Sequence, residues 1–155
     1  MAKNIKTNAC RILDKMKINY ELIVSGTGDE FVSGKEMAQV LGVKEDVIYK
    51  TLVTTSHSKT NYVFVIPSEK ELNLKDIAKI ANEKSIEMIH VADILKITGY
   101  MKGGCSPIGM KKHFKTFIDK DVLNHEYVYI SAGKRGYQIK LKPEDLINSS
   151  EGILF

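Results

Sequence analysis

The sequence predicts one α/β domain built around a mixed β-sheet, and three observations lead to this fold class. Segments with apolar residues at helical spacing alternate with short segments rich in β-branched and aromatic residues. The later half of the chain is rich in strand-like segments. No repeat, low-complexity tract or linker interrupts the 155 residues, a length that suits one domain with a substantial core. Pattern alone leaves open whether the sheet is curved or closed into a barrel.

In the first half of the chain, the expected elements are a helix from about Asn4 to Lys17, a strand at 20–24, a flexible turn at 25–29, a helix at 33–42, and strands at 47–55 and 62–67. The second helix is the best marked, because Ser33 and Glu36 form a capping-box pattern at its start. Gly42 supplies its stop, since glycine readily adopts the left-handed conformation that ends helices. The polar segment 57–61 is the expected turn between the two long strands.

In the second half, the expected elements are a helix at 74–84, a strand at 85–90, a short helix at 91–99, strands at 115–120, 126–133 and 137–141, and a last helix from Pro143. Gly99 marks the end of the short helix. Pro143 suits the first helical position. Proline has no backbone N–H, and an N–H at that position would have no hydrogen-bond partner within the helix. The long segment between residues 98 and 112 is left without an element.

The composition is that of an ordinary globular protein, with 43% hydrophobic and 27% charged residues. No apolar run approaches the ~20 residues that span a bilayer, and the N-terminal segment lacks the apolar region of a secretory signal. The two cysteines, Cys10 and Cys105, lie far apart, so we expect free thiols and a cytoplasmic location. The net charge of +4 is compatible with a polyanionic partner and equally with a mildly basic surface.

The segment "TGYMKGGCSPIGMKK", residues 98–112, concentrates four of the eleven glycines, one of the three prolines and three lysines. Glycines without a Cβ atom allow main-chain N–H groups to face a ligand oxygen directly, and Pro107 would stiffen one side. The segment is neither a dinucleotide-binding fingerprint nor a P-loop. A wide turn between a helix and a strand explains the same residues, so both interpretations stay open here.

Two further segments are candidates for a site. Lys50 interrupts the apolar strand "VIYKTLV", where simple alternation would place it on the solvent face. Alternatively, its ammonium stands at the mouth of a pocket and pairs with a phosphate or carboxylate. The segment "YISAGKRGYQI" predicts a hairpin with exposed basic residues. In the alternative interpretation it is a second ligand-facing loop, in which Ser131 and Gly133 leave room for a substrate.

The sequence offers no convincing nucleophile, general base or metal site. The four histidines, at positions 57, 90, 113 and 125, show no zinc spacing. Cys105 has no identifiable activating partner, and a thiol with a pKa of ~8.5 is mostly protonated at neutral pH. We therefore expect no metal or cofactor. Such a site either binds without chemistry or catalyses with a group that the substrate brings.

Four segments together resemble the YbaK/EbsC family of Cys-tRNA(Pro) deacylases. "VIYKTLV", "TGYMKGGCSPIGMKK", "ISAGKRGYQI" and "LKPEDL" stand in the order and spacing of that family, and the resemblance runs from Lys6 to Ile147. The family is related to the insertion domain of bacterial prolyl-tRNA synthetases. The resemblance implies that residues 1–155 form a single YbaK-like aminoacyl-tRNA editing domain. The implied fold is a mixed, barrel-like β-sheet surrounded by helices.

The resemblance also implies a set of site residues. The essential lysine of the family falls on Lys50, its G-x-x-x-P loop on Gly103 to Pro107, and its strand-end Ser-x-Gly on Ser131 and Gly133. The expected catalytic residues are Lys50, Gly103 and Gly104. The expected substrate-binding residues are Lys50, Thr51, Gly103, Cys105, Ser106, Pro107, Ser131 and Gly133. One departure concerns residues 24–30, "VSGTGDE", where glycines replace the aromatic and acidic or histidine residues that family members often carry.

The activity that the resemblance implies is removal of cysteine mischarged onto tRNA(Pro), and also from Cys-tRNA(Cys). Apolar pockets of synthetases reject near-isosteric amino acids poorly, so a second site must edit. The family suggests that the substrate's own thiol attacks its ester. Hydrolysis of Ala-tRNA(Pro) and non-catalytic binding of tRNA ends or nucleotides are the alternatives. The implied partners are aminoacyl-tRNA and prolyl-tRNA synthetase in a transient complex, with no membrane contact, and the protein itself is expected to be a monomer or a weak dimer.

Overall fold

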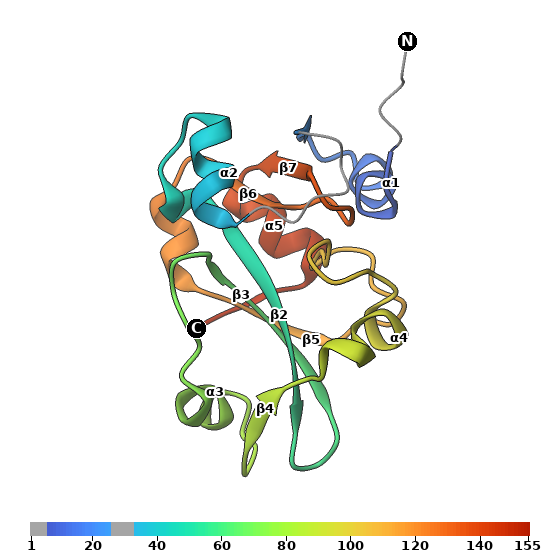
Figure 1. Ribbon diagram of the computed structural model, residues 1–155, viewed down its shortest axis with the longest axis vertical. Helices are drawn as coiled ribbons and strands as arrows, with labels where there is room; N and C mark the ends of the chain where they lie inside the picture. The colour runs from blue at the N-terminus through green and yellow to red at the C-terminus, as the bar shows by residue number, and fades with distance from the viewer. Residues whose placement is uncertain (1–5, 26–32) are drawn as a thin grey trace.

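The computed structural model (Figure 1) describes residues 6–25 and 33–155. The α-helices are α1 Asn8–Lys15, α2 Gly34–Leu41, α3 Leu74–Ile80, α4 Ile94–Thr98 and α5 Pro143–Ser150. The strands are β1 Glu21–Val24, β2 Tyr49–Ser56, β3 Asn61–Pro67, β4 Ile86–Met88, β5 Lys115–Ile118, β6 Val128–Ser131, β7 Tyr137–Leu141 and β8 Ile153–Leu154. Short 3-10 helices are η1 Glu45–Val47, η2 Val91–Asp93 and η3 Lys120–Asn124.

The strands form two sheets that meet at the start of β2. The smaller sheet is antiparallel, with strand order β1-β7-β6, and the larger has the order β4-β2-β3-β5-β8. In the larger sheet β3 pairs with β2 antiparallel and with β5 parallel, which confirms the predicted mixed sheet. A parallel bridge between Ile48 and Tyr129 links the two sheets, and Figure 1 shows β2 running from the smaller sheet along the larger one. The described strands do not close into a barrel.

The main hydrophobic core lies between the two sheets. It contains fully buried residues from both sheets and from two helices, including Leu13 of α1, Val65 of β3, Ile139 of β7 and Leu146 of α5. A second cluster packs α3 against the outer face of β3, around Phe64. A third, smaller cluster packs α2 against the junction of the two sheets. The junction of the two sheets is therefore packed on one side by the main core and on the other by α2.

Most predicted elements are present, and the differences lie mainly at their ends. Thr7 caps α1 by accepting a hydrogen bond from the Cys10 N–H (3.3 Å), so the helix begins at Asn8; residue 4, where we expected it to begin, lies outside the described residues. The predicted capping of α2 by Ser33 and Gly42 is confirmed. Helix α3 ends at Ile80 instead of residue 84, because the chain turns into the left-handed conformation at Asn82 (φ 57°).

Three further elements were not foreseen: the short helices η1 and η3 and the two-residue strand β8. The predicted turn at 25–29 falls almost entirely outside the described residues. No helix in residues 6–25 and 33–155 combines the length and the apolar character that crossing a membrane requires.

Candidate active site

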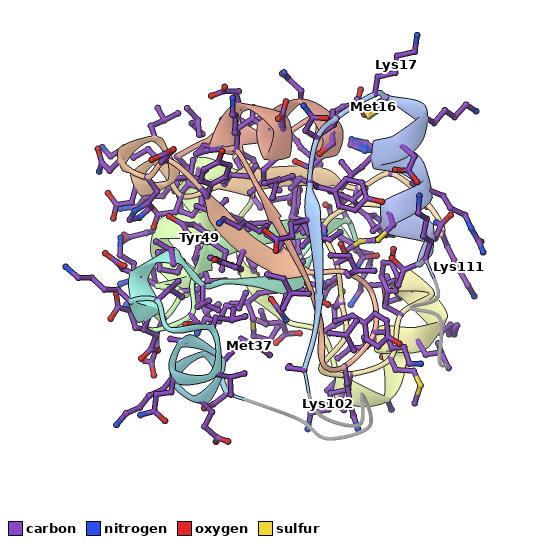
Figure 2. All side chains as sticks on the ribbon, turned by 90° about the horizontal axis from the view of Figure 1, so that it is seen from above. Met16, Lys17, Met37, Tyr49, Lys102 and Lys111 are labelled. Carbon is purple, nitrogen blue, oxygen red and sulfur yellow. The ribbon has the colours of Figure 1, made fainter. Side chains whose placement is uncertain are left out.

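A cavity of about 460 Å³ lies where the two sheets diverge, and we call it the site cavity. It is lined by Ser33, Gly34, Met37, Ile48, Tyr49, Lys50, Thr51, Leu52, Ser68, Ile94, Lys102, Gly103, Cys105, Ser131 and Gln138. Five of these are predicted site residues: Lys50, Thr51, Gly103, Cys105 and Ser131. They come from three segments far apart in the sequence, namely β2, the glycine loop and the end of β6. Figure 2 labels three other lining residues, Met37, Tyr49 and Lys102.

The edge of β2 is open where it borders the site cavity. Ile48 accepts a hydrogen bond from the Ser68 N–H (2.7 Å), and the Ser56 N–H donates to the Thr60 carbonyl (2.9 Å). Since hydrogen-bonded pairs alternate along an antiparallel ladder, the even-numbered residues of β2 bond to β3, and Thr51 presents its N–H and C=O to the other edge. Strand β4 covers that edge only at residues 54–56.

The Thr51 hydroxyl adds a further polar group at the same place. Its oxygen is buried and has no hydrogen-bond partner among the described residues. A buried polar atom without a partner is rare in a folded protein, because its desolvation is uncompensated. Together with the open main-chain edge, it makes this wall of the cavity suited to a polar ligand.

The charge at the cavity is positive. Lys50 is half-buried and Lys102 is exposed, and both line the cavity. None of the described lining residues is acidic, and within residues 6–25 and 33–155 neither ammonium takes part in an ion pair. Two unpaired lysines at one cavity favour an anionic ligand, such as a phosphate group.

Tyr100 holds the glycine loop, residues 98–112, in place. Its N–H donates to the Thr98 hydroxyl (3.0 Å), and its own hydroxyl donates to the Ile108 carbonyl (2.5 Å). Its ring packs on Gly133, where a Cβ atom would lie only 2.6 Å from the ring edge. Gly133 therefore makes room for Tyr100. Gly133 does not line the site cavity, so the expectation that it contacts substrate has no support from this structure and stays a prediction.

Gly104 packs the glycine loop against the β6–β7 turn. A Cβ atom at Gly104 would lie 3.2 Å from the main chain of both Lys134 and Arg135. Its N–H already donates to the Met101 carbonyl (3.0 Å), and the residue is buried outside the lining of the cavity. A turn within the loop uses that N–H in this structure, so the geometry does not support the expectation that Gly104 donates to a reacting oxygen, which stays a prediction.

Gly103 has the geometry that was expected of both glycines. It is exposed, lines the cavity and has a φ of 83°. The Arg135 Nε donates to the Lys102 carbonyl (2.7 Å). In a trans peptide the C=O and the following N–H point in opposite directions, so the Gly103 N–H points away from Arg135. In the described part of the chain this N–H has no acceptor, and it is free to bind a ligand oxygen.

Two other predicted contacts lie behind the loop. Ser106 is fully buried, and its hydroxyl accepts a hydrogen bond from the Ile108 N–H (3.3 Å). Pro107 lines a separate cavity of about 220 Å³ beside α5. Neither Ser106 nor Pro107 lines the site cavity, because the chain turns inward after Cys105, and their expected substrate contacts stay predictions that this arrangement does not support.

Cys105 lines the cavity but is not an activated nucleophile. Burial raises the pKa of its thiol from 9.0 to about 11, and the nearby Thr98 hydroxyl opposes this only in part. The thiol is thus protonated at neutral pH. Cys10 is also a free thiol and is fully buried in the core. Within the described residues no three His, Cys, Asp or Glu side chains lie together as metal ligands.

Several lining residues escaped the sequence analysis, among them Met37, Ser68, Ile94 and Gln138. They come from α2, the turn after β3, α4 and β7, so no local pattern connects them. Gln138 alone left a signal, since alternation in "YQIKL" places it on the face opposite the core residues. Its register partner on β6 is Ser131, which brings both to the cavity.

Comparison with known sequences matches the chain to an established family. The model for the aminoacyl-tRNA editing domain matches residues 30–148. A proposed Cys-tRNA(Pro)/Cys-tRNA(Cys) deacylase, EbsC of Enterococcus faecalis, is 40% identical over 147 residues, which are 95% of this chain and 90% of that protein. The prolyl-tRNA synthetase of Thermodesulfovibrio yellowstonii is 32% identical over 109 residues, which are 70% of this chain and 18% of the synthetase.

Solved structures share the fold over nearly the whole chain. A crystal structure of a hypothetical protein superposes with a TM-score of 0.85 at 22% identity and covers 96% of this chain and 97% of its own. A proposed trans-editing enzyme for prolyl-tRNA synthetase superposes with a TM-score of 0.81 at 18% identity, with 98% and 97% covered. At these identities the likeness concerns the fold alone.

Proposed function

The chain belongs to the aminoacyl-tRNA editing domain family, and from this membership we propose that it is a deacylase acting in trans on mischarged tRNA. The proposed substrate is Cys-tRNA(Pro), with Cys-tRNA(Cys) as a second one, as the name of its Enterococcus faecalis relative states for that protein. One observation carries the proposal. The site cavity combines the Lys50 cation with a free Gly103 N–H, and its only thiol is protonated.

A cavity of this kind suits a substrate that supplies its own nucleophile. In the proposed reaction, the thiol sulfur of the esterified cysteine attacks its own carbonyl carbon. The S–C bond forms, the ester C–O bond breaks, and the thiol proton ends on the departing ribose oxygen. The product is a cyclic thiolactone, which water later opens to free cysteine. The protein contributes orientation, which can supply several kcal/mol toward the barrier.

Each wall of the cavity has a distinct part in this scheme. The Gly103 N–H stabilises the developing oxyanion, and one such donor contributes roughly 3 kcal/mol. Arg135 positions that N–H, because it holds the carbonyl of the same peptide group at 2.7 Å. The Lys50 ammonium binds the terminal phosphate or stabilises the departing ribose oxygen. Thr51 and Ser131 bind the amino acid, since the open strand edge at Thr51 offers both a donor and an acceptor.

The test is a deacylation assay with cysteinyl, alanyl, prolyl and seryl esters of tRNA(Pro), combined with chemical trapping of any thiolactone. We expect rapid release of cysteine, a trapped thiolactone, and much slower release of serine, because a hydroxyl is a far poorer nucleophile than a thiol. Methylating the cysteine sulfur on charged tRNA is the matched control. Equal rates for cysteinyl, S-methylcysteinyl and seryl esters would contradict the substrate-thiol scheme.

The same assay separates the proposal from its two alternatives. Rapid release of alanine without any thiolactone would identify an Ala-tRNA(Pro) hydrolase that positions a water molecule. Binding of every ester without turnover would identify a non-catalytic module for tRNA ends. We expect the cysteinyl ester to be cleaved much faster than the alanyl, prolyl and seryl esters.

We also propose that selection of tRNA(Pro) depends on a transient complex with prolyl-tRNA synthetase. A chain of 155 residues with a net charge of +4 contacts only part of a tRNA, and phosphate contacts carry no sequence information. Sedimentation of the protein alone, expected as a monomer or weak dimer, and then with synthetase and tRNA tests this. Unchanged sedimentation in the mixture would contradict the complex.

A further inference from the structure

We propose that the acceptor stem of the tRNA lies on one basic face of the molecule, formed by residues 6–17 and 98–115 and called here the α1–loop face. This inference rests on the proposed function and adds where the body of the substrate binds. The two segments hold eight Lys or Arg residues and one Asp, a net charge of +7. The remaining 125 residues carry a net charge of −3. The mild overall charge therefore conceals a strong asymmetry.

The two segments form one continuous surface. The Asn8 side-chain amide donates to the Gly109 carbonyl (3.0 Å), which joins the start of α1 to the glycine loop. A Cβ atom at Gly109 would lie 3.1 Å from Ile12, so helix and loop also pack directly. In Figure 2, Lys17 stands at one end of α1 and Lys111 near its other end, on the same side of the molecule. The fold thus gathers charges that are some 90 residues apart in sequence.

The α1–loop face begins at the mouth of the site cavity. Lys102 lines the cavity and belongs to the face. Lys111 lies across the end of α4, where a Cβ atom on Gly99 would be 2.9 Å from its side chain. From there the face continues to the exposed Lys112 and to Arg11 and Lys15 on α1. An RNA strand that ends in the cavity would leave it along this row of cations.

Few acidic groups neutralise the face. Its one acid, Asp14, is paired with Lys6 (2.7 Å). Glu151, at the end of α5, approaches His113 (3.1 Å). Among the described residues, no ion pair involves Lys102, Lys111 or Lys112, and the six basic groups of the face from Arg11 to Lys112 stay available.

An RNA backbone is the partner that this arrangement fits. An ester at the tRNA 3′ end must enter the cavity, so the phosphates of the acceptor stem must lie close to its mouth. Lysines bind phosphates as point charges and give affinity without reading sequence. Binding of this kind releases counterions and weakens as salt rises. The face therefore supplies affinity for tRNA in general, and the cavity supplies selectivity for the amino acid.

The experiment compares two double variants that remove the same charge. Lys111→Gln with Lys112→Gln acts on the α1–loop face, and Lys75→Gln with Lys79→Gln acts on the exposed side of α3, at the other end of the molecule (Figure 1). We expect the first to weaken tRNA binding about tenfold at low salt and to make the negative slope of log K against log salt shallower by about 2. The second should match the unmodified protein.

A short substrate separates the face from the site. With a cysteinyl ester of the trinucleotide CCA, which has no acceptor stem, both double variants should keep the unmodified rate. With full Cys-tRNA(Pro), the first should raise KM and leave kcat unchanged. Because Lys111 packs on Gly99, Lys15→Gln with Lys17→Gln on α1 serves as a second variant of the face. We expect the same loss of tRNA binding from it.

Three outcomes would overturn the inference. Equal loss of tRNA binding in the face and α3 variants would mean that only net charge matters. Unchanged tRNA binding in both face variants would mean that the stem lies elsewhere. Loss of binding to anionic lipid vesicles with tRNA binding intact would assign the face to a membrane. Failure of the unmodified protein to cleave either ester would instead reject the proposed function, with tRNA binding still measurable.

Discussion

Two walls of the site cavity are held in place by different kinds of contact. The strand wall, residues 49–52, belongs to β2 and is fixed by main-chain hydrogen bonds to β3. The loop wall, residues 102–105, belongs to no strand or helix. It is held by the Tyr100 hydroxyl on the Ile108 carbonyl, by Arg135 on the Lys102 carbonyl, and by close packing at Gly104.

The difference indicates how each wall serves the site. In the proposed mechanism the side chains of Lys50 and Thr51 on the strand wall act directly, and replacing them should leave the strand in place because its main-chain hydrogen bonds to β3 remain. On the loop wall the proposed mechanism uses the main chain, which the side chains of Tyr100 and Arg135 hold in position. Substitutions on the strand wall should therefore affect chemistry alone, whereas substitutions around the loop wall should affect chemistry through position or stability.

The largest effect is expected for Lys50→Ala on the strand wall. Lys50 faces Ile66 in the ladder, and its main-chain hydrogen bonds persist without the side chain. We expect deacylation to fall by at least ~10²-fold, as for loss of other electrostatic groups at reacting centres. The thermal midpoint should stay within a few degrees. Lys50→Arg is the control for charge, and full activity in Lys50→Ala would remove the central role assigned to this residue.

A smaller loss is expected for Arg135→Ala at the loop wall. Freeing the Lys102 carbonyl allows the peptide group to rotate, so the Gly103 N–H spends less time toward the substrate. We expect kcat to fall roughly 10- to 100-fold with little change in KM. This loss is smaller than the one that follows complete removal of an oxyanion donor, because the Gly103 N–H is still present. Single-turnover rates on the CCA ester measure this.

The neighbouring Lys134→Ala is the matched control, because it removes the same charge and Lys134 contacts the Tyr137 ring (4.9 Å). Equal losses in the two variants would mean that charge, and not the position of the peptide, explains the effect. Arg135→Lys should not restore the rate fully, because an ammonium does not reproduce the planar guanidinium geometry.

Gly133→Ala tests the support of the loop through Tyr100. Gly133 has a φ of 102°, and a Cβ atom there would lie 2.6 Å from the Tyr100 ring. Gly42→Ala is the control, since its φ of 70° is also unfavourable for alanine but nothing lies within 4 Å. We expect about 1–2 kcal/mol of destabilisation for Gly42→Ala and about 1–3 kcal/mol more for Gly133→Ala. Urea unfolding measures both, and similar values would contradict the role of Tyr100.

The smallest effect on activity is expected for Cys105→Ala, because the protonated thiol has no role in the proposed mechanism. Deacylation should stay within about threefold of the unmodified rate. A large loss would indicate that this sulfur is a nucleophile after all, in spite of its raised pKa.

The same substitution has a consequence for stability at high pH. Burial raises the pKa of the folded Cys105 thiol to about 11 from 9.0, so the unfolded chain loses this proton first as pH rises. The contribution of this thiol to stability is fully present below pH 9 and declines between pH 9 and 11. Between pH 9 and 11, the free energy of unfolding of Cys105→Ala should therefore fall less than that of the unmodified protein.

Local chemistry explains why some features were predictable from the sequence. The cap of α2, the start of α5 at Pro143 and the strand "YQIKL" follow from neighbouring residues, and all three are confirmed. The glycine-rich composition of 98–112 likewise predicted a loop, and part of this loop lines the site cavity. The direction of each residue within that loop was not predictable. Gly103 and Gly104 are adjacent and chemically identical, yet only the Gly104 N–H is used within the turn, and the Gly103 N–H has no acceptor among residues 6–25 and 33–155.

The sequence by itself determined the local elements, the family and the segments that border the site cavity, because capping, periodicity and motif spacing are properties of neighbouring residues. Only the tertiary structure decided which of those residues line the cavity and which support it. Gly133 looked like space for a substrate, and it is space for Tyr100, 33 residues away. The basic face also required the structure, since the contact between Asn8 and Gly109 brings together charges that the chain keeps apart. Packing between residues far apart in the sequence decides these contacts, so no pattern of neighbouring residues predicts them.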